Sequence, residues 1–408
     1  MDSFEKLALV AGASEFEAEG EPTIRHVPTA HPDKNAGCQF SLTSQPALDS
    51  NSNRFILAKG HQIPIHRAVA PGGKRIPLLK AMLTTACEMN CRYCAFNKDR
   101  NYRRVTFKPQ ELAEVFFSIV QKGLVEGIFL STGIFNGGAN TQNRLLDTAQ
   151  ILRHCLGYRG YLHLKIMPGS EKDQLFQAMQ LADRVSINLE APNATRLSSL
   201  APHKQFEEQL LRPLQWMDEI RNQHSPHMTW NGAWPSTSTQ FVVGPAGETD
   251  LELISITAQL TKLSKVARTY FEAFNPVPGT PLQNHPPETP LRQHRLYQAS
   301  FLLRDYDFDL EDFSFTNSGN LPLEMDPKKA YAQMHLAQSP LELNSADYEQ
   351  LLRIPGIGPA GAKSITNARK NQKFHDLSQL RRFGILAERA APYILLDGKR
   401  PIQQLPLI

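Results

Sequence analysis

The sequence predicts an α/β protein: a partial (βα)6 TIM-type barrel, followed at its C-terminal end by a small all-α domain. Six short, β-rich apolar runs alternate with amphipathic helical stretches between residues 79 and 274. Such alternation is typical of parallel strands joined by right-handed helical crossovers. From residue 345 onward the pattern is helical only, which indicates a second domain.

The expected strands are short runs rich in β-branched and aromatic residues. They span residues 79–86, about 127–133, 161–167, 184–190, 238–244 and 266–274. The expected helices span residues 108–123, 143–156, 170–182, 204–221 and 249–263. In βα barrels the chemistry collects at the C-terminal ends of the strands, so polar and glycine residues there are the candidate site residues.

The domain boundaries follow shifts in composition. Residues 1–75 are polar with scattered Pro, Asn and Ser, which predicts an irregular N-terminal segment. The barrel core is expected over residues 76–310, a turn-rich linker over 311–344 and the helical domain over 345–398.

The composition is that of an ordinary globular protein with 408 residues, 41% of them hydrophobic and 21% charged. This length accommodates one large enzyme core and a smaller appended domain. No run approaches the roughly 18 apolar residues of a membrane span, and the first residues are acidic where a signal peptide is basic. We therefore expect a cytoplasmic protein with no membrane partner.

Positive charge is concentrated at the C-terminal end. The whole chain has a formal net charge of only +4, yet residues 346–408 contain ten Lys or Arg against five Asp or Glu. This imbalance suggests contact with a polyanion, although a solvated helical surface has a similar composition.

Three of the five cysteines lie close together after the first expected strand. Cys87, Cys91 and Cys94 follow a C-x3-C-x2-C spacing, which can place three thiolates on three corners of one 4Fe-4S cluster. With no fourth Cys nearby, one iron keeps an open position. That iron can chelate the amino and carboxylate groups of S-adenosylmethionine (SAM), so that an electron from the cluster breaks the bond between the sulfonium and the 5′ carbon.

Two other interpretations of the triplet remain. A zinc site would require a fourth Cys or His at regular spacing, and the nearest histidines, His61 and His66, lie upstream of the strand. A chance group of buried thiols is the second alternative. The isolated Cys155 is expected to be a core residue of a helix, and Cys38 has no ligand partner near it in the sequence.

The cysteine loop, with Tyr93 directly before the third cysteine, resembles that of the radical SAM superfamily. The resemblance implies an enzyme in which Tyr93 packs near the adenine of SAM. It also implies SAM contacts at three further strand ends, and Lys165 is a candidate contact on the same rim. These contacts are Ser131, Thr132 and Gly133; Ser186, Asn188 and Glu190; and Gly244 with Glu248. The Glu that usually ends the first of these segments in the family is absent here.

The C-terminal region contains a helix, a Pro-Gly-Ile-Gly hairpin and a second helix that begins at Pro359. Gly356 and Gly358 permit the tight turn, and the N–H groups of the hairpin then form a cradle for phosphate. The segment resembles the helix-hairpin-helix DNA-binding motif, with Lys363 beside the phosphate and a degenerate second copy around Gly384. Contacts of this kind read the backbone and carry no base sequence. The alternative is a helical pair that only packs or docks a protein.

Longer strings are similar to a narrower family of radical SAM proteins named for DNA modification or repair. They include GYLHLKIMPG, DRVSINLEAPN, LRQHRLYQASFLLRDY and LLRIPGIGP, and the similarity runs from about residue 78 to 396. This resemblance implies DNA as a partner, an electron donor protein, and a uracil-DNA-glycosylase-like protein encoded nearby. The first 75 residues match the family poorly.

The main hypothesis is a radical SAM enzyme that acts on a nucleotide of DNA or RNA. A second hypothesis is a non-catalytic iron-sulfur DNA-binding protein, in which the cluster serves structure or redox sensing. A third keeps the radical enzyme and makes its substrate a protein or a small molecule.

Overall fold

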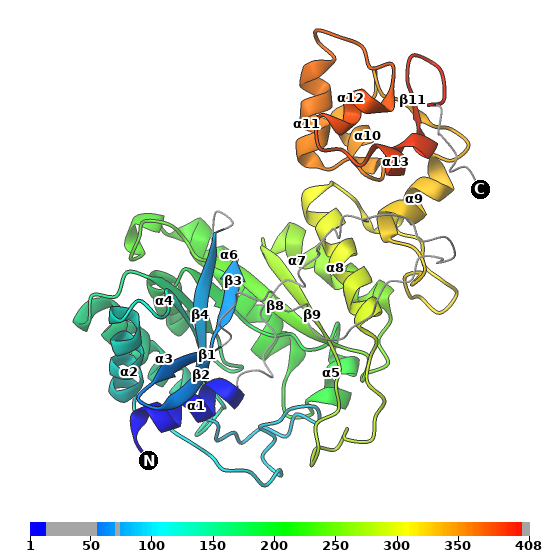
Figure 1. The fold of residues 1–408 in the computed structure, drawn as a ribbon. Coiled ribbons are helices and arrows are strands. Elements are labelled where there is room, and N and C mark those ends of the chain that lie inside the picture. Colours follow the sequence, from blue (N-terminus) through cyan, green and yellow to red (C-terminus); the bar gives the residue numbers. More distant parts are fainter. Residues whose placement is uncertain (14–54, 70–73, 402–408) are drawn as a thin grey trace. The chain divides into compact units, whose positions relative to one another are not determined.

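A computed structural model of the chain describes residues 1–13, 55–69 and 74–401, which belong to two compact units (Figure 1). The first unit comprises residues 1–246 and 264–290, and the second comprises 247–263 and 291–408. No helix within the described ranges combines the length and the apolar character that a bilayer span requires.

A curled seven-stranded sheet forms the centre of the first unit (Figure 1). Its strands follow one another in chain order, β4 to β9 are parallel, and β3 pairs antiparallel with β4. All six expected strands are present, and the predicted partial (βα)6 barrel is confirmed. Strand β3 was not predicted, because its four residues include two polar ones. The strands are β3 (His66–Val69), β4 (Arg75–Met82), β5 (Gly127–Ser131), β6 (Tyr161–Lys165), β7 (Arg184–Ser186), β8 (Ser236–Val243) and β9 (Arg268–Ala273).

Five helices connect the parallel strands at the expected places, and a sixth, α5 (Ala194–Leu200), was not predicted. The five are α2 (Pro109–Gln121), α3 (Gly138–Gln150), α4 (Lys172–Leu181), α6 (Arg212–Gln223) and α7 (Asp250–Leu263). α3 continues into a π-helical turn, Ile151–Cys155, and a second π-helical turn, Phe206–Leu211, leads into α6. The expectation that Cys155 is a core residue is wrong: it ends the helix and is exposed.

The two faces of the sheet differ in chemistry. Residues such as Ile128, Leu130 and Leu162 form one fully buried apolar face, as expected beneath the helices of a βα barrel. The alternate residues are largely polar, and several hydrogen-bond to one another across the strands. His163 Nε2 lies 2.8 Å from Ser186 Oγ, and Arg184 donates to Ser236 Oγ at 3.0 Å. The inner face of the half-barrel is therefore polar.

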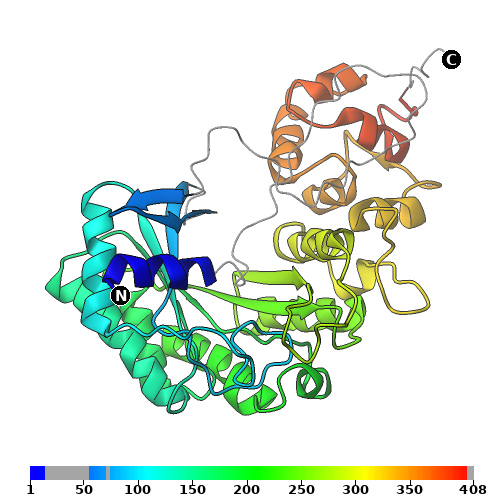
Figure 2. The ribbon, with the colours of Figure 1, turned by 60° about the horizontal axis from the view of Figure 1, so that its bottom comes forward.

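The N-terminal segment is more regular than predicted. Its described part contains α1 (Ser3–Ala13) and an antiparallel hairpin of β1 (Phe55–Ala58) and β2 (His61–Pro64), turned at Lys59 and Gly60 with positive φ (Figure 2). The helix α1 was not predicted, because polar residues dominate the composition of the N-terminal segment as a whole. Cys38 and the rest of residues 14–54 lie outside the described residues.

The second unit is built mainly from helices. α7 and α8 (Pro290–Asp305) belong to it, and Arg292 of α8 holds the start of α7 through Asp250, at 2.8 Å. The helix-hairpin-helix region follows. Its elements are α9 (Pro327–His335), β10 (Leu341–Glu342), α10 (Tyr348–Arg353), α11 (Pro359–Ala368), α12 (Leu377–Arg381), α13 (Ala387–Ala390) and β11 (Ile394–Leu395).

The segment expected to be a linker, residues 311–344, is part of this unit. β10 pairs in parallel with β11, and Ala332, Leu336 and Leu343 share one buried core with the hairpin helices. The apolar face predicted for these helices is confirmed, since its five residues are at most 2% exposed. They are Leu351, Leu352, Ile357, Ala362 and Ile365.

Candidate functional site

The three clustered cysteines lie in the loop between β4 and α2. Its backbone is fixed at both sides: Leu83 N donates to Ser131 O at 2.8 Å, and Thr85 N donates to Val105 O at 2.9 Å. Cys91 is buried, whereas Cys87 and Cys94 are partly exposed, and all three thiols are free of disulfides. The loop thus presents three thiols at the C-terminal end of the first parallel strand.

Gly133 allows the end of β5 to press against this loop. Its N–H donates to Thr84 O at 2.7 Å. A Cβ at Gly133 would lie 2.3 Å from Ala86 O and 3.1 Å from Cys87 Cβ, which no side chain can tolerate without displacing the loop. The glycine is therefore needed for the close approach of two strand ends.

The two residues before Gly133 differ in the hydrogen bonding of their hydroxyl groups. Thr132 Oγ1 donates to Gly133 O at 2.9 Å. Ser131 is fully buried, and its Oγ has no hydrogen-bond partner among the described residues. A buried hydroxyl without a partner costs free energy, so this position suits a polar ligand at the strand end.

Glu190, which follows β7, is held in a buried polar group. Lys204 Nζ donates to its Oε1 at 2.9 Å, and only 9% and 6% of the two side chains is exposed. The Tyr93 hydroxyl donates to the same carboxylate. Glu190 also has a φ of 65°, an uncommon backbone conformation for a residue with a side chain. The structure therefore brings Tyr93 and Glu190 together and adds Lys204, which the sequence analysis did not identify.

The charges around this group are coupled. Burial acts to raise the pKa of Glu190, but the Lys204 and Lys165 ammonium groups outweigh it and hold the pKa below its ordinary value. Burial raises the pKa of the Cys91 thiol, and Lys204 opposes that rise. The Lys204 ammonium thus lies within electrostatic reach of both the carboxylate and the cysteine loop.

The remaining predicted SAM residues of the first unit occupy the expected strand ends. Ser186 pairs with His163, and Asn188 is partly buried just after β7. Gly244 follows β8 with a φ of 109°, and a Cβ there would lie 2.8 Å from Glu288 Oε2. Any direct contact of these residues with SAM remains a prediction.

Glu248 belongs to the second unit. It is 3% exposed, and its carboxylate lies 3.7 Å from the Arg292 guanidinium, which also donates to its backbone carbonyl at 2.7 Å. This environment explains the burial of Glu248, and its predicted role toward SAM remains a prediction.

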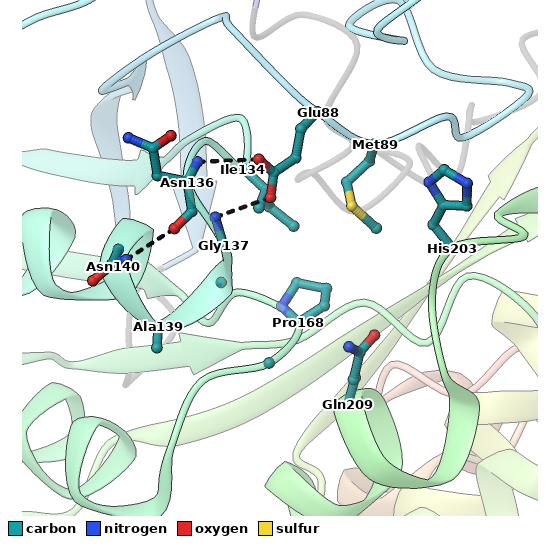
Figure 3. Close-up of a pocket in the computed structure, with 12 residues that line it drawn as sticks. Glu88, Met89, Ile134, Asn136, Gly137, Ala139, Asn140, Pro168, His203 and Gln209 are labelled. Carbon is teal, nitrogen blue, oxygen red and sulfur yellow. Dashed lines mark hydrogen bonds between the residues drawn. The ribbon is translucent and has the colours of Figure 1, made fainter.

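A cavity of about 380 Å³ lies beside the cysteine loop at the C-terminal strand ends (Figure 3). Glu88, the residue after Cys87, forms one wall, and its carboxylate accepts from the backbone N–H groups of Asn136 at 3.1 Å and Gly137 at 2.9 Å. Asn140, His203 and Gln209 add amide and imidazole groups to the lining. The volume falls within the range of about 300–1,000 Å³ that is usual for small-ligand pockets.

The hairpin of the second unit turns at the predicted glycines. Gly356 has a φ of 87°, Gly358 precedes the first turn of α11, and Lys363 is exposed on that helix. The N–H of Ile357, between them, donates to Ile354 O at 3.1 Å, and phosphate contact remains a prediction. At the predicted degenerate second copy, Gly384 turns between the short helices α12 and α13, and Leu386 N donates to Gly356 O at 3.4 Å. The segment after this second turn is therefore hydrogen-bonded to the first hairpin.

These features suit a three-thiolate cluster and SAM. Among the residues that the structure describes, no three His, Cys, Asp or Glu side chains are grouped as ligands of a single metal ion. A 4Fe-4S cluster does not require such a grouping, because each thiolate binds a different iron. The unpartnered Ser131 hydroxyl and the buried charges near Cys91 are polar groups of the kind that could contact SAM.

Comparison with known families gives two matches. Residues 82–254 match the family described as the Radical SAM superfamily, and residues 337–390 match the helix-hairpin-helix motif. The first match contains the cysteine triplet and every predicted SAM residue, and the second contains both hairpins. A search of curated proteins finds no match.

Three solved structures are among those that match the chain, each at low sequence identity. Methylornithine synthase (PylB) is 15% identical with a TM-score of 0.44, and the match covers 56% of this chain and 61% of that one. The FeFe-hydrogenase maturase HydG from Carboxydothermus hydrogenoformans has the same identity and TM-score over 56% and 51%. A radical SAM methyltransferase from Sphaerobacter thermophilus is 14% identical with a TM-score of 0.41 over 59% and 70%. The chain thus spans less than two thirds of the first two proteins.

Proposed function

We propose that the chain is a radical SAM enzyme, whose radical SAM domain spans residues 82–254, and that it acts on a nucleotide of a nucleic acid, in DNA modification or repair. The cofactors of this superfamily are a 4Fe-4S cluster and SAM. One observation carries the proposal: a single chain joins the cysteine loop to a module of two helix-hairpin-helix hairpins.

The protein's own residues have separable tasks in this proposal. Cys87, Cys91 and Cys94 hold the cluster, which with SAM supplies a 5′-deoxyadenosyl radical for hydrogen abstraction. Ser131 offers its unpartnered hydroxyl to SAM at the end of β5. Lys204 fixes the Glu190 carboxylate in one orientation, so that it can accept from a ligand hydroxyl or amine without rearranging.

The second unit supports a nucleic acid as the substrate. The hairpin N–H groups and the exposed Lys363 suit phosphate oxygens, and contacts of this type bind any sequence. The side-chain amides that line the cavity beside the cysteine loop are suited to the hydrogen-bonding edge of a nucleobase.

Anaerobic reconstitution tests the proposal. Reduced, cluster-loaded protein is incubated with SAM, with and without DNA, and 5′-deoxyadenosine is measured by chromatography while the DNA is digested for mass spectrometry. We expect SAM cleavage that increases when DNA is present, together with a changed nucleotide. Cys91→Ala should abolish both. DNA binding and a bound cluster without SAM cleavage would instead support the non-catalytic alternative.

The other partners remain proposals. An electron donor protein is required by the reductive chemistry, and a uracil-DNA-glycosylase-like protein is suggested only by the family resemblance. A cytoplasmic location is likewise a prediction from the sequence. If SAM cleavage responds to a peptide or a metabolite but not to DNA or RNA, the substrate is a protein or a small molecule.

A further inference from the structure

A strongly basic stretch follows the cysteines within the same loop. Residues 92–108, called the basic loop below, contain four Arg and two Lys against a single acidic residue, Asp99. The fold of the first unit does not account for this excess of positive charge, because the loop lies outside the sheet and the helices. Figure 2 shows the loop in light blue, crossing in front of the strands.

The basic loop is held in place by its own arginines and by the end of β4. Tyr102 donates to Thr85 O, and the guanidinium groups of Arg104 and Arg100 lie 4.5 Å and 5.5 Å from its ring centroid. Arg104 also donates to Lys98 O at 2.9 Å, and Phe107 N donates to Leu83 O at 2.9 Å. The loop is therefore fixed before any partner binds, which lowers the entropic cost of binding.

The remaining basic side chains are available. Arg92, Lys98 and Lys108 are exposed, and within the described residues their side chains make no ion pair or hydrogen bond. Arg103 is partly neutralised, since its guanidinium lies 4.0 Å from Glu5. Three exposed cations are thus distributed along the segment that runs from the cysteines to α2.

We propose that the basic loop is a second nucleic-acid surface, which binds the phosphates that flank the target nucleotide. The inference rests on the proposed function and adds a contact site in the catalytic unit itself. The observation that supports it is charge complementarity. Exposed Arg and Lys side chains that neutralise phosphates release the counterions condensed on the nucleic acid, which favours binding. The hairpins would contact phosphates from the second unit, and the basic loop adds a phosphate contact in the first unit, within the loop that contains the cysteines.

The test measures binding of a fluorescein-labelled DNA duplex, and of the same strand alone, to the full-length cluster-loaded chain across a range of salt concentrations. The triple variant Arg92→Gln, Lys98→Gln, Lys108→Gln should bind both probes about tenfold or more weakly at moderate salt. Its salt dependence, the slope of log K against log salt, should fall by about 2 to 3, since each phosphate contact contributes about 0.7–0.9.

A control triple removes equal charge from the opposite ends of the strands. Arg67, Lys122 and Arg159 are exposed and lie at or before the N-terminal ends of β4, β5 and β6. Changing all three to Gln should leave affinity within about twofold, because they lie away from the cysteine loop. Iron content reports whether the loop is intact, and if the first triple loses iron, the double variant Lys98→Gln, Lys108→Gln replaces it, with an expected fall in slope of about 1.5 to 2.

The outcomes separate this inference from the proposed function. Equal binding by the first triple and the control, with normal binding by the unmodified protein, overturns the basic loop as a nucleic-acid surface and leaves the proposed function intact. Normal DNA binding by the first triple combined with slower reduction by an acidic flavoprotein also overturns it, and assigns the loop to the electron donor. Failure of the unmodified protein to bind either probe defeats the proposed function itself.

Discussion

A buried lysine lies next to the cysteine loop, and its surroundings explain why it is retained there. Lys204 is fixed to Glu190 at 2.9 Å, and both side chains are almost fully removed from water. Burial of one charge alone is costly, so the ammonium and the carboxylate depend on each other. The pair also keeps a positive charge close to thiolates that become more negative when the cluster is reduced.

Replacing Lys204 by Met should destabilise the protein strongly. The change leaves the Glu190 carboxylate buried without its cation, for which a loss of about 3–5 kcal/mol in the free energy of unfolding is expected. Urea unfolding of the cluster-free protein measures this quantity. The matched control is Lys172→Met, whose pair with Glu219 is 39% and 48% exposed and is expected to contribute less than about 1 kcal/mol. Equal losses in the two variants would contradict the prediction.

Glu272 of β9 should make stability depend on pH. Burial raises its pKa to about 7 from an ordinary value of 4.5, against the opposing charge of Lys80. Between these two values the folded protein binds a proton that the unfolded chain has lost, so stability falls as pH rises through that window. Glu272→Gln should remove this decline. The free energy of unfolding is measured against pH for the unmodified protein and for Glu272→Gln. If the two curves run in parallel between pH 4.5 and 7, the Glu272 carboxyl does not have a raised pKa.

Part of the candidate site could be predicted from the sequence at the level of single residues. The cysteine triplet follows from local spacing at a strand end, and Tyr93 and Gly133 follow from the resemblance to the radical SAM superfamily. Lys204 could not be predicted, because it lies in an irregular segment and only the fold brings it to Glu190. The contact of Glu248 with Arg292 could not be predicted either, because Arg292 lies 44 residues further along the chain.

At the scale of elements, the end of β5 and the cysteine loop form one assembly. Gly133 is the contact point, and a Cβ there would collide with backbone rather than with a flexible side chain. The six parallel strands were predictable because each lies in a short β-rich segment between expected helices. The short β3 and α5 were not, since β3 has two polar residues among four and α5 has only seven residues.

Gly133→Ala should cost the protein most of its cluster. The added methyl group would lie 2.3 Å from Ala86 O, so the loop must shift and Cys87 moves with it. Iron and acid-labile sulfide per chain after anaerobic reconstitution measure the effect. Gly12→Ala is the control, because a Cβ there meets nothing within 4 Å inside helix α1, and its iron content should equal that of the unmodified protein. Full iron content in Gly133→Ala would show that the loop tolerates the shift.

At the scale of the whole molecule, the chain divides differently from the sequence prediction. The second unit takes α7 from the middle of the barrel sequence and absorbs the expected linker. Composition could not reveal this, because the contacts that define the unit join residues far apart in the chain. Arg353 makes three such contacts. Its guanidinium donates to Asp307 O at 2.8 Å, pairs with Asp312 at 3.0 Å and lies 4.1 Å from the Phe308 ring centroid.

Arg353→Ala should loosen the hairpin module within the second unit. Loss of these partly buried charged contacts is expected to lower the local opening free energy by about 1–3 kcal/mol, which corresponds to cleavage about 5- to 150-fold faster in limited proteolysis of residues 336–346. Lys370→Ala is the control, since this side chain is exposed and has no partner within the described residues. Unchanged proteolysis of Arg353→Ala would mean that the apolar core alone fixes the module.

The sheet of the first unit ends at β9 without closing on β3 or β4. A ligand can enter a closed eight-stranded barrel only through one end of the barrel. That route suits a small molecule that is not part of a polymer. A sheet that stops short instead has two separate edge strands, β3 and β9. Under the proposed function this suits a nucleotide that is still joined to neighbours on both sides, because the polymer would not have to be broken before the reaction and rejoined after it.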